Sequence, residues 1–126
     1  MLDFAATMSG TLDEFSVDDH FAGKSPSARI VYDCLLAALQ RIGPIREEPK
    51  KTSIHLVRSS ALAGVEVRKD YLLLNLKTDY RIDSPRIAKA EQISARRFHQ
   101  RVKLVSPSDV DSELERWLAD AYALSG

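Results

Sequence analysis

Apolar and polar residues alternate in four segments of this sequence, and no other feature constrains the fold as strongly. The four segments are residues 52–58, 61–68, 71–77 and 98–105. In the first, Ile54 and Leu56 alternate with Ser53 and His55, which is the period of a β-strand with one buried face. Short turns join the first three segments. We therefore predict a three-stranded meander that the fourth segment extends to an antiparallel sheet of about four strands.

A segment with a helical period precedes these strands. It begins at Ser25-Pro26, where serine suits the N-cap and proline suits the first turn. Apolar residues then recur at three- and four-residue steps until Gly43-Pro44, which ends the predicted helix. This pattern predicts one apolar stripe that packs on the sheet.

A second helix is predicted at the C-terminal end, capped by Ser106-Pro107 or by Ser108. Its apolar stripe is the clearest in the chain and again favours packing on the sheet. A shorter helix is predicted from residue 84 to about residue 93, because a serine–proline pair opens this segment too.

Together these elements predict an α+β fold, a two-layer sandwich whose antiparallel sheet is covered on one face by the N-terminal and C-terminal helices. A length of 126 residues suits one domain. Residues 1–19 contain five acidic residues and no basic residue. We expect this acidic leader to lack stable structure until it docks, and residues 20–126 to form the domain.

The single cysteine, Cys34, cannot form an intramolecular disulfide. The sequence also lacks the paired Cys and His spacing of a structural zinc site. No segment has the length and apolarity of a secretion signal or a membrane span. We therefore expect a cytoplasmic protein with no cofactor, no metal and no membrane partner.

The formal net charge of zero conceals an uneven distribution. Residues 49–103 contain thirteen basic and five acidic residues, a net charge of +8, and the two ends carry the balancing negative charge. The predicted sheet is therefore basic and its flanks are acidic.

The polar side of the predicted sheet is the first candidate site. With the helices on the apolar side, the other side carries Ser53, His55, Tyr71, Asn75, Lys77, His99, Arg101 and Lys103. Cations can neutralise phosphates there, while tyrosine and imidazole rings offer flat surfaces for unpaired bases. The alternative is that these residues form the solvated side of a half-exposed sheet, where cations discourage edge-to-edge association.

Two pairs of basic residues form a second candidate site. Lys50-Lys51 precedes the first predicted strand, and Arg96-Arg97 precedes the fourth. A phosphate clamp is one interpretation, but it depends on the order of the strands. Solvated loop charge is the alternative.

Catalytic interpretations have little support. Glu48 and Lys51 do not have the spacing of a metal-dependent nuclease, and no second carboxylate converges on them by sequence. Cys34 falls on the apolar stripe of the first helix, which favours a small buried side chain over a nucleophile. The three histidines have no serine or cysteine partner in a recognisable motif. We therefore assign no catalytic residue and rank an enzyme below the binding and interaction hypotheses.

Four phrases, taken together, indicate a resemblance to a known family. They are VDDHFAGKSPSARIVYDCLLAAL (residues 17–39), EPKKTSIHL (48–56), RIDSPRI (81–87) and VKLVSPSDVDSELERWLADAY (102–122). The chain resembles domain of unknown function 5655, a family of small bacterial and archaeal domains that sometimes carry the label "predicted transport protein". The resemblance covers about residues 17–122 and implies a helix, antiparallel strands and a closing helix, with no established activity.

The resemblance also implies a set of contexts. Similar domains stand alone, follow a short cysteine-containing segment, or end larger proteins that look like modification-dependent restriction nucleases. The last context suggests nucleic acid by association. This chain departs from the second, because residues 1–16 contain no cysteine.

Two functional hypotheses follow. The first is a non-catalytic binding or accessory module that contacts nucleic acid or another polyanion through its basic sheet face. The alternative is a protein-interaction or homo-oligomeric assembly module, in which the acidic ends of one copy meet the basic sheet of another. An enzyme of unknown reaction is the third.

Overall fold

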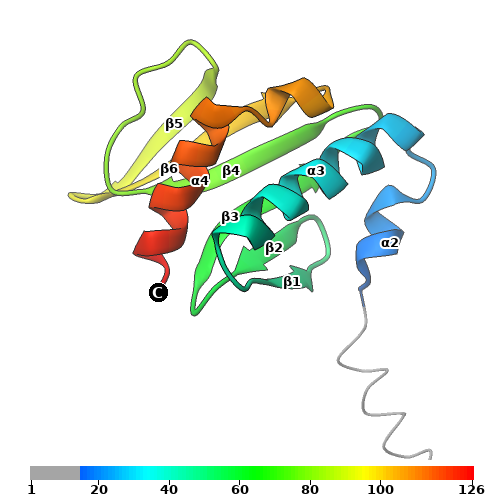
Figure 1. Cartoon of the computed structure of the whole chain (residues 1–126), viewed down its shortest axis with the longest axis horizontal. Helices are drawn as coiled ribbons and strands as arrows, with labels where there is room; N and C mark the ends of the chain where they lie inside the picture. The colour runs from blue at the N-terminus through cyan, green and yellow to red at the C-terminus, as the bar shows by residue number, and fades with distance from the viewer. Residues whose placement is uncertain (1–14) are drawn as a thin grey trace, which may run out of the picture.

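The computed structural model describes residues 15–126, which form a six-stranded antiparallel sheet and three α-helices (Figure 1). The strands are β1 (Arg46–Pro49), β2 (Ile54–Val57), β3 (Ala61–Val67), β4 (Leu72–Thr78), β5 (Ile87–Ser94) and β6 (Arg97–Leu104). The helices are α2 (Val17–Phe21), α3 (Pro26–Ile42) and α4 (Ser112–Leu124), and a 3-10 helix spans Pro107–Asp109. The strand order is β1-β2-β3-β4-β6-β5.

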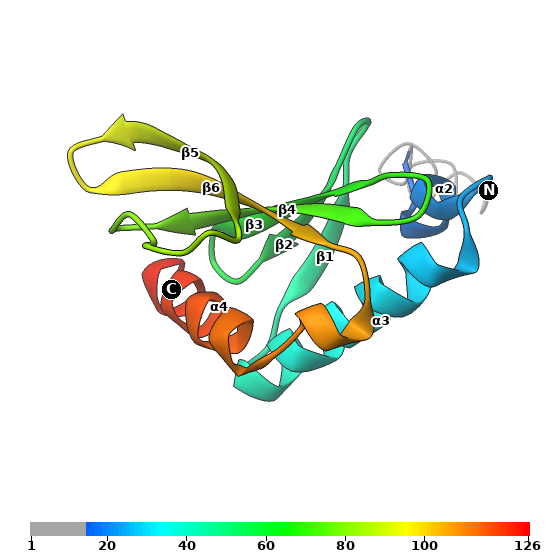
Figure 2. The same ribbon diagram turned by 90° about the horizontal axis from the view of Figure 1, so that it is seen from above.

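Helices α3 and α4 lie on the same face of the sheet, as the view from above shows (Figure 2). The predicted α+β class, with helices on one face, is confirmed. The core lies between the two layers. Its fully buried side chains include Leu35 of α3, Leu74 of β4 and Leu118 of α4.

The predicted alternation is confirmed in the centre of the sheet. Leu72, Leu74 and Leu76 of β4 are fully buried, while the residues between them are partly exposed. Strands β2, β3 and β4 are consecutive neighbours, so the predicted meander is also confirmed. Buried leucines on one face of the strands therefore fix which face the helices cover.

Helix α3 has the predicted bounds, with Pro26 in its first turn and Gly43 after its last residue. Gly43 donates its backbone N–H to the carbonyl of Leu39 at 3.1 Å. It also leaves room for Tyr122 of α4, because a Cβ at this position would lie 2.6 Å from Tyr122 Cζ. A glycine here thus ends the helix and permits the close approach of α4.

The predicted sheet of about four strands is too small, since the structure has six. The predicted helix over residues 84–93 is wrong, because Ile87–Ser94 is strand β5. Strand β5 is mostly exposed and shifts its register against β6 twice. Its sequence therefore does not alternate regularly between apolar and polar residues. Strand β1 was missed because its sequence, Arg46–Pro49, has no apolar alternation.

The N-cap of the last helix also differs from the prediction. Asp109 accepts the backbone N–H of Ser106 at 3.1 Å, and this contact closes a separate 3-10 helix. Asp111 caps α4 instead, accepting the backbone N–H of Leu114 at 3.0 Å. An aspartate is as good a cap as a serine, so the sequence offered two competing signals.

Residues 17–19, which the sequence analysis assigned to the acidic leader, belong to α2. His20 of this helix donates from Nε2 to the carbonyl of Lys50 at 2.7 Å. The bond attaches α2 to the turn between β1 and β2. Residues 1–14 of the leader lie outside the described residues.

One buried polar side chain organises the segment after β4. Gln100 of β6 is fully buried on the helix side of the sheet. Its Nε2 donates to Thr78 Oγ1 at 2.6 Å and to the carbonyl of Tyr80 at 2.8 Å, and its Oε1 accepts the backbone N–H of Ile82 at 2.9 Å. Gln100 therefore replaces the regular pairing that the chain loses as it leaves β4.

Candidate binding face

The face of the sheet opposite α3 and α4, called the open face below, has no described helix against it (Figure 2). A row of residues crosses its centre. His55 of β2 and Asn75 of β4 are both cross-strand partners of Gly64 in β3. Arg101 of β6 is in turn the partner of Asn75. Their alternation with buried residues directs all of these side chains to the open face.

The remaining predicted face residues lie beside this row. Lys77 of β4 pairs with His99 of β6. Lys103 lies one pleat beyond Arg101, and its Nζ is 4.4 Å from the centre of the Tyr71 ring. The open face thus brings together His55, Tyr71, Asn75, Lys77, His99, Arg101 and Lys103, as alternation predicted.

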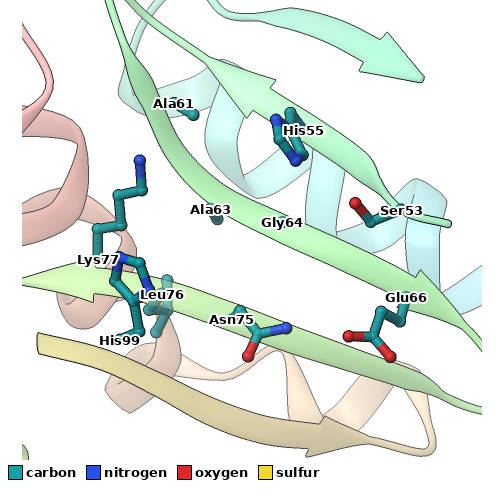
Figure 3. A pocket seen from close by; sticks show the side chains of 10 residues that line it. All are labelled: Ser53, His55, Ala61, Ala63, Gly64, Glu66, Asn75, Leu76, Lys77 and His99. Atoms are coloured by element: carbon teal, nitrogen blue, oxygen red, sulfur yellow. The ribbon is translucent and has the colours of Figure 1, made fainter. Parts of the chain in front are cut away.

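A hollow of about 300 Å³ lies in the middle of the open face (Figure 3). Its floor is β3, where Ala61, Ala63 and Gly64 line the hollow with small or absent side chains. His55 lies on one side of this floor and Asn75 on the other (Figure 3). One signal for this feature is visible in the sequence: Gly64 lies within the predicted strand 61–68, and such a glycine is typical of a close approach by a neighbour.

Gly64 keeps the floor of the hollow low. A Cβ at this position would lie 3.7 Å from Cδ2 of His55, an ordinary contact distance. The backbone therefore tolerates a side chain here, and the glycine is not required by strain. What the missing side chain provides is open space between His55 and Asn75.

The two ends of the hollow carry different charged groups. Lys77 and His99 lie together at one end, and Glu66 lies at the other (Figure 3). Glu66 accepts from Arg68 Nη2 at 2.8 Å and from Arg101 Nη2 at 3.1 Å. This carboxylate, which sequence reasoning did not include, is therefore paired with two guanidinium groups.

The count of +8 overstates the cationic character of the open face. Arg86 donates to Asp111 at 3.0 Å and to Glu113 at 3.1 Å, so its charge is paired in the helical layer. Arg58 donates to the carbonyl of Tyr122 at 3.0 Å, next to the C-terminal end of α4. Within residues 15–126, Lys77 and Lys103 form no ion pair. Lys89 and Glu91 of β5, the cross-strand partners of Arg101 and His99, also form none, so the unpaired charges of the face are three lysines and one glutamate among the described residues.

Burial lowers the pKa of His55 below that of a free imidazole, and the positive charges of Lys50 and Lys77 lower it further. The ring is therefore neutral at pH 7 and presents one N–H donor and one acceptor nitrogen. A neutral, partly buried ring at the wall of a hollow suits stacking or hydrogen bonding more than charge neutralisation.

The proposed clamp of two basic pairs is not assembled. Strands β2 and β6 are separated by β3 and β4 and run in opposite directions, so Lys50-Lys51 and Arg96-Arg97 lie at opposite ends of the sheet. Lys50 Nζ lies 3.7 Å from a carboxylate oxygen of Glu48. Lys51 lies in the β1–β2 turn, and Arg96 and Arg97 lie at the β5–β6 hairpin.

The described part of the chain contains no cluster of side chains suited to a metal ion. Among residues 15–126, no three His, Cys, Asp or Glu side chains lie close enough together to hold a metal ion. Cys34 of α3 is a free thiol of intermediate exposure, less buried than its place on the apolar stripe predicted.

A sequence model of the family described as "Domain of unknown function (DUF5655)" matches residues 17–125. The chain belongs to this family. The match runs from the first residue of α2 to the residue after α4, so the DUF5655 domain includes every described helix and strand. Comparison with curated proteins and with solved structures gave no match.

The helices of this DUF5655 domain are short. In residues 15–126, none combines the length and the apolarity that crossing a bilayer requires.

Proposed function

We propose that this domain is a non-catalytic binding module whose open face holds a nucleic-acid strand. The observation that carries the proposal is the hollow of the open face, with the free lysine Lys77 and two imidazoles, His55 and His99, around it. Phosphate binding needs cations at a solvent-accessible surface, and the open face supplies them with no helix of residues 15–126 over it.

The charge balance of the face supports an anionic ligand. Glu66 is the acidic residue of the hollow, and together with Arg68 and Arg101 it forms a group of net charge +1. Lys77 and Lys103 add two further positive charges. The carboxylate of Glu66 is therefore compensated and does not repel a polyanion that lies across β4 and β6.

The aromatic groups support nucleic acid over other polyanions. Lys103 lies over the ring of Tyr71 and leaves that ring at the surface of the sheet beside a cation. His55 and His99 add two planar rings at the hollow, farther along the sheet. Open sheets that carry aromatic rings between cations bind single strands by stacking bases and neutralising phosphates.

The test is fluorescence anisotropy of a labelled single-stranded oligonucleotide over a salt series. We expect binding at low ionic strength that weakens as salt rises. Lys77→Gln removes one phosphate contact and lowers the slope of log K against log salt by about 0.7. Arg116→Gln is the matched control, because Arg116 is exposed on α4, in the layer opposite the open face.

Two outcomes would contradict the proposal. One is the absence of salt-sensitive binding at low ionic strength. The other is an equal loss of affinity in Lys77→Gln and Arg116→Gln, because the charge of the whole molecule would then explain the effect. For the alternative, an assembly module, sedimentation at two ionic strengths is decisive, since a strictly monomeric species at low salt excludes it.

A further inference from the structure

The hollow of the open face has the form of a subsite for one planar group. Strands β2 and β4, which carry His55 and Asn75, both neighbour β3. Adjacent strands are about 4.8 Å apart, so these two are separated by roughly 10 Å across the floor at Gly64. The volume of about 300 Å³ is at the small end of ligand sites. A hollow of this size holds one nucleotide and not a stack of several.

The groups around the floor suit the edge of a base. Arg101 Nε donates to Oδ1 of Asn75 at 3.3 Å, which leaves the amide NH₂ of Asn75 as the donor for a ligand. Ser53, beside His55, adds a hydroxyl that can donate or accept. An unpaired base presents hydrogen-bond donors and acceptors along its Watson–Crick edge. In a duplex, base pairing already uses these donors and acceptors.

The different groups at the two ends give the ligand a direction. Lys77 and His99 lie at the end that suits a phosphate. At the other end, the Glu66 carboxylate accepts from Arg68 and Arg101 and keeps further lone pairs for a hydrogen-bond donor such as an exocyclic amine. A nucleotide has this polarity, with the phosphate at one end and the base edge at the other. A plain polyphosphate does not, because it carries negative charge along its whole length.

We infer that the hollow is a subsite for a single unpaired nucleotide, with the base over Gly64 between His55 and Asn75 and the phosphate at Lys77 and His99. This inference rests on the proposed function and makes it narrower. The ligand is single-stranded nucleic acid or an extruded base. A duplex would contact the open face only through its phosphates.

The experiment compares three labelled probes of equal length: an intact single strand, the same strand with abasic sites, and a duplex. The wild-type domain binds the intact strand at least tenfold more tightly than the abasic strand or the duplex, in line with the loss of a stacked base. Gly64→Leu fills the hollow, so it lowers affinity for the intact strand to that for the abasic strand and leaves abasic binding unchanged. Gly64→Ala is the matched control and keeps the preference, because its Cβ fits at 3.7 Å from His55.

The possible results distinguish failure of the nucleotide subsite from failure of the proposed nucleic-acid binding. If no probe binds, the proposed function itself is wrong. If the probes bind with salt sensitivity but with equal affinity, phosphate binding stands and the nucleotide subsite is excluded. An unchanged preference in Gly64→Leu also excludes the subsite. Should Gly64→Leu fail to fold, the comparison of the intact and abasic strands on the wild-type domain decides the question alone.

Discussion

Replacement of Gln100 by leucine tests whether one buried amide holds the chain in place after β4. The side chain makes three hydrogen bonds, to Thr78, Tyr80 and Ile82, and is fully excluded from solvent. Leucine has a similar size but can make none of them. The substitution therefore isolates the polar contribution from the filling of space.

The expected loss follows from the partners that remain. Thr78 Oγ1 still donates to the carbonyl of Tyr80 at 2.7 Å, so that carbonyl keeps a partner. The backbone N–H of Ile82 loses its acceptor in a buried position, and leaving one such group unpaired costs about 1–3 kcal/mol. Apolar burial of leucine offsets part of the total loss, so Gln100→Leu lowers the free energy of unfolding by about 2 kcal/mol.

Urea unfolding followed by circular dichroism measures this change. With an m-value of about 2 kcal/mol/M, the unfolding midpoint falls by about 1 M. Gln92→Leu is the control, since Gln92 is exposed on β5 and its one side-chain bond is to the carbonyl of Ser94. It shifts stability by less than about 0.5 kcal/mol. Equal shifts in the two variants would refute the role assigned to Gln100.

Two further substitutions test contacts made by the helical layer. Gly43→Ala places a methyl group 2.6 Å from Cζ of Tyr122, whose hydroxyl is held at 3.0 Å by the carbonyl of Pro44. It lowers the free energy of unfolding in urea by about 1–3 kcal/mol, whereas a midpoint like that of wild type would show that the ring moves freely. Tyr32 donates to Glu47 at 2.6 Å, and burial, followed by that bond, raises the Tyr32 pKa far above its usual value of about 10. The folded state keeps the Tyr32 proton that the unfolded state releases, so stability is present below about pH 10 and falls as pH rises above it. Unfolding in urea at pH 8 and pH 11 shows a smaller fall for Tyr32→Phe than for wild type, and an equal fall would contradict the assignment.

The centre of the sheet could be predicted from the sequence because it lies between solvent and a single apolar layer. The leucines of β4 alternate with Asn75 and Lys77, and that alternation alone assigned both residues to the open face. The bounds of α3 could also be predicted, because a proline marks its start and a glycine its end. In each case a local signal agreed with the tertiary structure.

The edges could not be predicted by the same reasoning. Strands β1 and β5 pack little apolar surface, so pairing with a neighbour, and not burial, holds them in the sheet. A serine–proline pair before β5 then favoured a helix that the neighbouring β6 overrides. The residues of β5 alone do not indicate that β6 will pair with them.

Charge pairing was the part of the site that sequence could not supply. Glu66 and Arg101 are on strands separated by β4, and their ion pair depends on the register of three strands. The same applies to Arg86, whose partners are on α4 and just before it. Summing charges along a segment therefore predicted its sign but not how much of that charge is free.

The two register shifts of β5 affect how separate molecules meet. They interrupt the strand between Ile87 and Lys89 and again between Gln92 and Ser94. A neighbouring chain that approached this border would find only a four-residue stretch of even backbone, with a lysine and a glutamate in it. Such a stretch is too short to template a growing fibre. In crowded solution the domain can therefore expose the edge of β5 without polymerising along that strand.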